Sequence, residues 1–478
     1  MNPERIDRRI VSSRKETGKY VLYWMQQSQR INYNHALLYA MESANKKNLP
    51  LLVYFGLTDD FPEANERHYT FMLEGIQTIS QKLNAMGVEF LITGDSPEEG
   101  IRPLLKDAAE IIMDKGYLRI QRQWREKIEN ELQKMDKSFS TVESDVVVPI
   151  HMVSQKAEYA ARTIRPKIKK QLNLFLEEFE LPQMKHIFPS ILKKEISESC
   201  INKIDLDDLK IILKNMTIDH TVKPSLSFYG GEQKANEYLS QFIHQKLCLY
   251  LESSSPAVDY CSGLSPYLHF GQISPVYIVK EIEKAILQNP DLSKAGDAFL
   301  EQLIIRRELS MNYIYYNKDY DSFDGMTEPW AYKTMQEHLS DPREYIYTIE
   351  ELEYGRTHDC YWNAAMFEMV QTGYMHNYMR MYWAKKVLEW SKTPESAYQT
   401  IVYLNNKYFL DGRDANSFAG IAWCFGKHDR AWTSRNIFGK LRYMNQNGLL
   451  RKFEMDDYIK RVDNMKGNYT RNTVSFLF

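Results

Sequence analysis

The chain has 478 residues, more than the roughly 250 to 300 that one hydrophobic core usually accommodates, so at least two domains are expected. Its 61 basic and 63 acidic side chains nearly cancel, and a net charge of -2 points to no particular partner. The five cysteines lack metal-binding or C-x-x-C spacing, which argues against a zinc site and against a disulfide-stapled secreted domain.

The N-terminal segment "MNPERIDRRI" is charged, and no apolar run is long enough to cross a bilayer. The sequence therefore predicts a soluble cytoplasmic protein without membrane contact and without a bound metal.

The first third of the chain alternates short apolar runs with amphipathic segments. The runs "YVLYWM" at 20, "LPLLVYFGL" at 49, "VEFLITG" at 88, "EIIMD" at 110 and "VVVPI" at 146 are typical of buried strands. Because parallel strands need helical crossovers, the pattern predicts a doubly wound parallel-sheet, Rossmann-like α/β domain over residues 1–150. No G-x-G-x-x-G or P-loop motif is present, so its loops indicate no dinucleotide or P-loop phosphate site.

The pattern changes after residue 150. Residues 151–228 begin with a helical segment and continue as a polar, weakly patterned stretch, which we interpret as a long interdomain connector. From 229 to 478 apolar residues recur at helical spacing, in segments such as "DAFLEQLIIRRELSMNYIYY" and "NAAMFEMVQTGYMHNYMRMYWAKKVLEW". The sequence therefore predicts a C-terminal domain that is entirely helical.

Basic residues gather in this helical region. Between Met375 and Lys452 there are 13 Lys or Arg and 5 Asp or Glu, so the rest of the chain carries the acidic excess. Such segregation indicates a local site for a polyanion, although a solvated basic face is the competing interpretation.

Tryptophans gather there too: five of the eight fall within the 71 positions from Trp362 to Trp432. On a helix Arg380, Trp383 and Trp390 share one face, and a rise of about 1.5 Å per residue separates the two tryptophan backbones by roughly 10 Å. That gap is too wide for ring contact, but Trp362 from a neighbouring helix can bridge it and complete a path for stepwise electron transfer. Ordinary core packing is the alternative that spacing alone leaves open.

Four blocks occur in order in the helical region: "GLSPYLHFGQIS" from 263, "MHNYMRMYWAKKVLEW" from 375, "LNNKYFLDGRDANSFAGIAW" from 404 and "HDRAW" from 428. They resemble signature blocks of the photolyase/cryptochrome superfamily, and most closely those of class II cyclobutane pyrimidine dimer photolyases. The resemblance runs through nearly the whole chain, from "YVLYWMQQSQR" to "GKLRYMN". Several blocks matching in one order are more specific than any single motif.

The resemblance implies a deoxyribodipyrimidine photo-lyase, a lyase that splits pyrimidine dimers in DNA by light-driven electron transfer from reduced FAD. It implies a U-shaped FAD in the helical domain, a flipped-out dimer, monomeric action, and association with the nucleoid when DNA is bound. The α/β domain of such proteins can hold an antenna chromophore, an 8-hydroxy-5-deazaflavin or a folate, and this sequence does not choose between them.

By the same resemblance, the residues that hold FAD are Tyr250, Ser262, Gly263, Leu264, Ser265, Gln272, Arg380, Asn405, Asp411 and Asp414. Hydroxyls and N–H groups at a helix start suit a pyrophosphate, while an ordinary serine cap or a plain turn is the alternative for these motifs. Arg380 is the expected ion partner of Asp411. Asn405 matches the residue near flavin N5, and its neutral amide can meet that atom with or without a proton.

Trp383, Trp362 and Trp390 match the electron-transfer relay of class II members, with Trp383 next to the flavin, Trp390 near the surface and Tyr382 as an auxiliary member. On the DNA side the matching residues are Met381 and Trp423 in the dimer pocket, with Arg306, Arg430, Trp432 and Arg442 around it. Flat apolar surfaces receive unstacked bases and offset part of the cost of flipping them, and arginines hold phosphates.

The lesion side departs from the family pattern. Gln302 stands where relatives have a catalytic Glu that hydrogen-bonds the dimer, and Glu301 lies about 100° away around a helix. An amide still donates a hydrogen bond, so we expect reduced rather than absent repair. Ser253 stands where class II members commonly have Arg. These changes keep a second interpretation open, a cryptochrome-like FAD photoreceptor with weak or no repair. A third, a nucleic-acid binder without cofactor, does not account for the flavin blocks.

Overall fold

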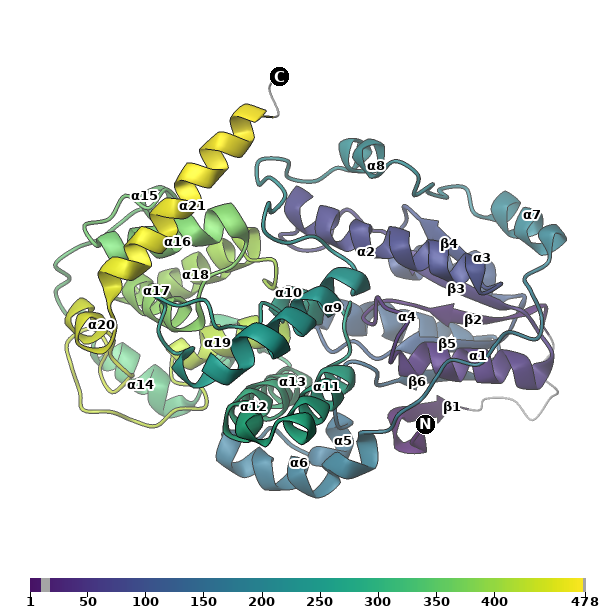
Figure 1. The fold of residues 1–478 in the computed structure, drawn as a ribbon, viewed down its shortest axis with the longest axis horizontal. Coiled ribbons are helices and arrows are strands. Elements are labelled where there is room, and N and C mark those ends of the chain that lie inside the picture. The colour runs from purple at the N-terminus through teal and green to yellow at the C-terminus, as the bar shows by residue number, and fades with distance from the viewer. Residues whose placement is uncertain (10–17, 476–478) are drawn as a thin grey trace.

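The computed structural model describes residues 1–9 and 18–475, which form a sheet-containing part and a helical part side by side (Figure 1). The elements of the sheet part are, in chain order, η1 (Pro3–Arg5), β1 (Ile6–Arg9), β2 (Tyr20–Trp24), α1 (His35–Lys47), β3 (Leu51–Gly56), α2 (Glu66–Ala85), β4 (Glu89–Thr93), α3 (Pro97–Leu105), β5 (Ala108–Asp114), α4 (Arg119–Lys134) and β6 (Phe139–Val142).

The six strands form one sheet in the order β1-β6-β5-β2-β3-β4, in which all neighbours are parallel except β1, which pairs antiparallel with β6. Val21 and Tyr23 of β2 face a core that they share with α1 and α2, whereas Leu22 and Trp24 face a core shared with α3 and α4. Helices therefore cover both faces of the sheet, as buried parallel strands require. The predicted doubly wound α/β fold is confirmed.

Two details of the sheet differ from the prediction. The run at 146–148 is not a strand, and the edge strand β1 forms instead from the charged N-terminal segment. Val147 is fully buried, but side chains satisfy its main chain: Arg5 donates to its oxygen at 2.7 Å, and Glu308 accepts from its N–H at 2.9 Å. The run is apolar because it is buried. Its main-chain groups need no neighbouring strand, because side chains form their hydrogen bonds.

Beyond Val142 the described residues form helices and loops and no strand. The helices are α5 (Ile150–Val153), α6 (Ala161–Phe175), α7 (Ser190–Ser199), α8 (Leu209–Asn215), α9 (Glu232–Gln241), α10 (Ser265–His269), α11 (Pro275–Gln288), α12 (Ser293–Leu300), α13 (Arg307–Tyr316), α14 (Pro329–Glu337), α15 (Ile349–Glu353), α16 (Cys360–Thr372), α17 (Asn377–Trp390), α18 (Pro394–Tyr408), α19 (Ala415–Cys424), α20 (Gln446–Lys452) and α21 (Met455–Ser475). Shorter helical turns are η2 (Phe242–Lys246), η3 (Leu247–Glu252), η4 (Pro290–Leu292), η5 (Glu301–Arg306) and η6 (Phe323–Gly325).

The polar stretch after α6 is more ordered than its composition indicates. It runs along the sheet part and carries α7 and α8 (Figure 1). Ile196 and Cys200 pack into the core on one face of the sheet, and Leu206 and Leu213 into the core on the other. A few apolar residues thus anchor a segment in which most of the other side chains are exposed or half-buried.

The start of α2 ties the two parts together. The Arg67 guanidinium donates to the main-chain oxygens of Val370 at 2.5 Å and Tyr408 at 2.9 Å, at the C-terminal ends of α16 and α18. The ring of His68 pairs with the oxygen of Phe409 at 3.0 Å. Helix C-termini carry unpaired carbonyl groups and a partial negative charge, so one arginine satisfies both helices. No helix within 1–9 and 18–475 is both long and apolar enough to span a membrane.

Candidate active site

Three buried tryptophans form a continuous path between α16 and α17. The ring centroids of Trp383 and Trp362 lie 6.3 Å apart with an interplanar angle of 14°, and Trp362 contacts Trp390 edge-on at 5.5 Å. The indole N–H of Trp362 donates to the main-chain oxygen of Trp383 at 3.0 Å, which holds its ring in place. Trp362 fills the gap that the seven-residue spacing leaves.

This contact depends on a break that the periodic sequence hides. The segment predicted as one helix is two, because α16 ends at Gly373, whose φ of 76° is the left-handed conformation common after helices. α17 then restarts with His376 as its N-cap. Asp359 caps α16 by accepting from the N–H of Trp362 at 3.0 Å. The break allows the two helices to pack against each other, which brings Trp362 onto Trp383.

The outer end of the path is covered by the side chains of an adjacent segment, so the Trp390 ring is itself buried. Trp390 is 2% exposed, and the rings of Tyr347 and His358 each lie 5.3 Å from it. The Tyr347 hydroxyl and His358 Nδ1 are 2.6 Å apart, and Tyr345 stacks on His358 at 3.8 Å while remaining partly exposed. Sequence reasoning missed these residues because they lie in an irregular segment before α16, outside any helical period.

The inner end of the path is charged. Arg380 Nη2 lies 2.9 and 3.1 Å from the two carboxylate oxygens of Asp411, so the predicted ion pair is present. The guanidinium lies 3.9 Å over the ring of Phe409, which in turn contacts Trp383 at 6.3 Å. The auxiliary candidate Tyr382 is buried and donates to the carboxylate of Asp359.

Asn405 lies in the last turn of α18, close to this ion pair. Its Nδ2 donates to Asn406 Oδ1 at 2.8 Å and to Ser417 Oγ at 3.0 Å. Ser417 Oγ also lies 3.2 Å from the main-chain oxygen of Asp411. These bonds join α18, α19 and the intervening loop into one unit around the ion pair.

The same region has the properties of a cofactor site. The indole N–H of Trp383 is buried without a hydrogen-bond partner among the described residues, and such a donor costs free energy unless a ligand or water pairs with it. Gly263, in the loop before α10, has φ 68°, and a Cβ there would lie 2.9 Å from the Tyr238 ring. Only glycine, which has no Cβ, allows the loop to approach the Tyr238 ring this closely. The residues present therefore fit a flavin at this position.

The other flavin candidates divide into two groups. Ser262, Leu264 and Ser265 lie at the start of α10, where Ser262 Oγ accepts from the N–H of Leu264 at 3.4 Å. Tyr250 packs edge-on against Phe299 at 5.4 Å in the core beneath them.

Gln272 and Asp414 have other neighbours. Gln272 is fully buried, donates to the oxygen of Phe71 at 3.2 Å and accepts from the N–H of Gly231 at 2.7 Å, so its amide joins α2 to the start of α9. Asp414 caps α19 and lies 3.6 Å from the ring of His269.

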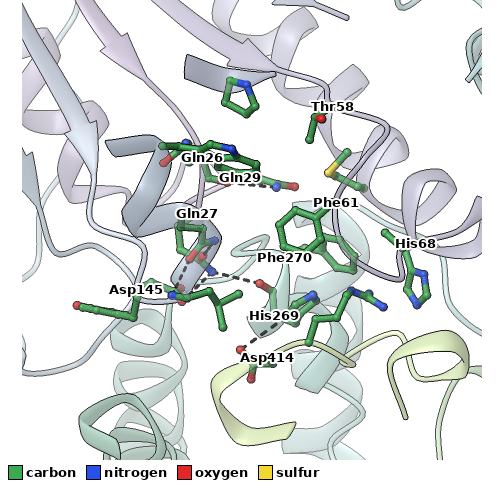
Figure 2. A pocket seen from close by; sticks show the side chains of 18 of the residues that line it. Gln26, Gln27, Gln29, Thr58, Phe61, His68, Asp145, His269, Phe270 and Asp414 are labelled. Carbon is green, nitrogen blue, oxygen red and sulfur yellow. Dashed lines mark hydrogen bonds and ion pairs between the residues drawn. The ribbon is translucent and has the colours of Figure 1, made fainter. Parts of the chain in front are cut away.

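Asp414 and His269 line a cavity of about 110 Å³ between the sheet part and the helical part (Figure 2). Phe61, Phe270 and other apolar side chains form much of its wall. Five polar atoms on residues that line it are buried without a hydrogen-bond partner among the described residues: Gln26 Nε2, Gln29 Oε1, Asp145 Oδ1, His269 Nδ1 and Arg413 Nη2. His269 Nδ1 and Asp145 Oδ1 have only longer ion-pair contacts, with Asp414 at 3.6 Å and Arg30 at 3.7 Å. Buried polar atoms without hydrogen bonds in a largely apolar cavity indicate a site for an aromatic ligand with polar edges.

Two carboxyl groups of this cavity differ in their readiness to ionise. Burial raises the pKa of Asp145 to about 6, although Arg307 Nη2 lies 2.9 Å away and favours the charged form. Burial also disfavours the charge of Asp414, but the nearby His269 and Arg307 hold its pKa at about 2. The cavity therefore offers one firmly charged carboxylate and one that is protonated in mild acid.

Cations and indoles alternate on another face of the helical part. Arg442 lies 4.3 Å over the ring of Trp432 and 5.3 Å over that of Trp423, and Arg430 lies 4.9 Å over Trp432. Asp429 holds Arg442 in place, with Nε at 2.9 Å and Nη2 at 3.2 Å from its oxygens. Four of the predicted DNA contacts, Trp423, Arg430, Trp432 and Arg442, thus come together in one layered group, whereas Met381 is half-buried on α17.

Gln302 and Arg306 are both exposed on η5, a π-helical turn between α12 and α13. π-helical turns are rare in proteins overall, but those that occur are frequently found at functional sites. Glu301 is held by Arg165 at 2.6 and 3.0 Å, so it does not take the place of Gln302.

Sequence reasoning also missed Lys385, which lies behind Trp423. Its Nζ donates to the oxygen of Cys424 at 2.5 Å and lies 5.8 Å from the centroid of the Trp423 ring. Burial lowers the pKa of this lysine to about 8. A lysine in an amphipathic helix normally indicates an exposed face, so its burial has no signal in the sequence.

Comparisons with known proteins identify relatives of this chain. The DNA photolyase family model matches residues 21–184. The chain is 44% identical to the deoxyribodipyrimidine photo-lyase of Methanothermobacter thermautotrophicus over 93% of this chain and 95% of that protein, and 39% identical to the Arabidopsis thaliana protein of that name over 93% and 89%.

Cryptochromes are more distant in sequence. Cryptochrome-1 of Sinapis alba is 22% identical over 76% of this chain and 71% of its own length. The crystal structure of a Synechocystis cryptochrome has the same fold, with a TM-score of 0.73 at 17% identity over 94% of this chain and 89% of that one. By the extent and level of its identity to the photo-lyases, the chain belongs to the DNA photolyase family.

Proposed function

We propose that this protein is a deoxyribodipyrimidine photo-lyase that splits cyclobutane pyrimidine dimers in DNA, using light absorbed by FAD in the helical part. The observation that carries the proposal is the unbroken path Trp383, Trp362, Trp390 beside the Arg380–Asp411 pair, in a chain that is 44% identical to a photo-lyase. A relay of this kind has no use in a protein that only binds nucleic acid.

When bound, FAD is the chromophore that absorbs light and the source of the electron for the dimer. The chain supplies the surroundings. Arg380 places a positive charge beside the flavin site, and Asp411 fixes the guanidinium so that no reorganisation is needed when charge moves. Trp383, which is 2% exposed, excludes water from the inner end of the relay and passes electrons inward from Trp362.

On the DNA side, we assign base stacking to Trp423 and Trp432 and phosphate contacts to Arg430 and Arg442. Indole faces accept any unstacked base, which offsets the cost of extruding the dimer. Gln302 donates an amide hydrogen bond to the dimer from the exposed turn η5. We assign to this chain the class II subgroup of the family on the sequence blocks that it shares with that subgroup.

A cryptochrome-like photoreceptor is the second candidate, and Gln302 is the observation that favours it. The two are separated by illuminating the reduced, FAD-loaded protein with blue light in the presence of an oligonucleotide that contains one thymine dimer. Recovery of thymine absorbance in the ultraviolet is expected. Specific binding of the damaged DNA with no recovery would reject the lyase and leave the photoreceptor.

The cavity between the two parts suits a second, light-harvesting chromophore, and we propose that function for it. On this proposal, residues 1–150 are an antenna domain, residues 151–228 a connector, and residues 229–478 the FAD- and DNA-binding catalytic domain. The polar atoms available in the cavity are both donors and acceptors, which suits the edge of a fused heterocycle. Titrating the FAD-loaded protein with 8-hydroxy-5-deazaflavin and with a folate, and following energy transfer to the flavin, decides between them; no binding of either would reject the antenna.

A further inference from the structure

The residue after Asn405 has an amide whose orientation is fixed from two sides. Asn406 is 3% exposed, and its Oδ1 accepts from the main-chain N–H of Arg413 at 3.0 Å. Its Nδ2 donates to the carboxylate of Glu63, which belongs to the sheet part. A main-chain N–H can only donate, and an ionised carboxylate can only accept. The two ends of the Asn406 amide are therefore not interchangeable.

This orientation determines that of Asn405. Since Asn406 presents its oxygen at 2.8 Å, the atom of Asn405 that faces it must be the NH2 group. The second hydrogen of that group is directed to Ser417 Oγ at 3.0 Å. Both donors of Asn405 are then used, whereas its Oδ1 has two lone pairs, of which Ser417 can occupy one. Toward any further partner, the Asn405 side chain can therefore only accept a hydrogen bond, through Oδ1.

Two residues that hydrogen-bond the Asn406 side chain have a rare backbone conformation. Glu63 has φ 58° and Arg413 has φ 63°, both in the left-handed region that residues other than glycine seldom adopt. The Arg413 guanidinium also donates to the main-chain oxygen of Asn406. Such conformations persist where the surroundings over-determine them, and they cluster at functional sites. Here two of them, 350 positions apart in the chain, converge on one buried amide.

We propose that Asn406 is a positioning residue that holds Asn405 as a hydrogen-bond acceptor toward the flavin, so that flavin N5 is favoured in its protonated form. The inference rests on the proposed FAD site and goes beyond it, because a freely rotating amide would serve N5 in either state. Asn405 would then accept the hydrogen of a protonated N5, with Trp383 supplying the electron and water the proton. The oxidised relay is reduced in turn by an external thiol.

The test is the visible spectrum of the one-electron-reduced flavin, produced by blue light with dithiothreitol as electron donor. In the wild type we expect the blue-coloured form, in which N5 carries a proton. Asn406→Leu keeps the size of the side chain but removes its three polar contacts, with Arg413, Glu63 and Asn405, so Asn405 is free to rotate and present its NH2 group. We expect a shift toward the red-coloured, unprotonated form. An unchanged spectrum in a variant with full FAD content would overturn the proposal.

A matched control keeps the hydrogen bonds while changing the residues. In the double variant Asn406→Asp with Glu63→Gln, one carboxylate oxygen accepts from Arg413 and Asn405 and the other from the new glutamine amide. We expect the wild-type spectrum, and a shift as large as that of Asn406→Leu would contradict the proposal. If Asn406→Leu does not fold, Asn406→Ser, which is too short to reach Asn405, takes its place with the same expectation. A wild-type protein that binds no FAD would instead refute the proposed function.

Discussion

Replacing Trp432 by Ala tests whether the layered group of indoles and arginines binds the damaged DNA. Arg442 and Arg430 lie 4.3 and 4.9 Å from the Trp432 ring, and the substitution removes the indole stacking surface while both cations remain. Stacking of one base on an aromatic side chain contributes ~1–3 kcal/mol. At 1.4 kcal/mol for each factor of ten, the affinity for dimer-containing duplex should fall by about 5-fold to 150-fold.

The assay is fluorescence anisotropy of a duplex with one central thymine dimer, titrated at several salt concentrations beside an undamaged duplex. Because an indole carries no charge, the slope of log affinity against log salt should stay as in the wild type. Trp390→Phe is the matched control, since that residue is buried in the relay and should leave binding unchanged. Binding by Trp432→Ala within about twofold of the wild type, less than 0.5 kcal/mol, would refute the assignment of base stacking to this residue.

Further outcomes are expected elsewhere in the molecule. Trp362→Phe should abolish photoreduction of oxidised flavin while FAD content stays complete, because it reopens the roughly 10 Å gap between Trp383 and Trp390; normal photoreduction rates would exclude this relay. Gln302→Glu should raise the quantum yield of repair without strengthening dimer binding, and equal yields would show that the amide serves as well as the acid. Arg430→Gln should lower the salt slope by about 0.9, and Arg442→Gln by less, since Asp429 already pairs with Arg442; equal reductions would contradict this. Lys385→Met should remove a pH dependence of unfolding, because the pKa of Lys385 is about 8 in the folded protein and about 10.5 in the unfolded chain. Between these pH values the free energy of unfolding of the wild type should rise by about 3 kcal/mol relative to the variant. Urea midpoints of the two proteins that change in parallel with pH would contradict this.

The fold was largely predictable because its two periodicities are strong. Strands such as β2 and β3 are short apolar runs, and the helical part carries long amphipathic segments. The errors came where a pattern has more than one physical cause. The run at Val147 is apolar because it is buried, and Arg5 and Glu308 satisfy its backbone in place of a strand. The charged β1 has no alternation to reveal it.

The site was predictable where short-range geometry decides it. Helical spacing placed Arg380 and Trp383 on one face and pointed to Trp362 as the bridging ring, and the resemblance supplied Asp411 as the partner of Arg380. The rest depends on contacts between distant segments. Glu63 meets Asn406 only after folding, and the five buried polar atoms of the cavity that lack a hydrogen bond come from both parts of the chain. Neither the burial of Lys385 nor the covering of Trp390 has a local signature.

The arginine at the start of α2 has a consequence for how such proteins are put together. Arg67 closes the ends of two helices that belong to the other part of the chain. If the first 150 residues were cut away, α16 and α18 would each lose a capping partner, on the same helices that carry Trp362 and Asn405. The sheet part is thus also a structural support of the helical part. Any exchange of the first 150 residues for those of a relative must preserve the α2 junction.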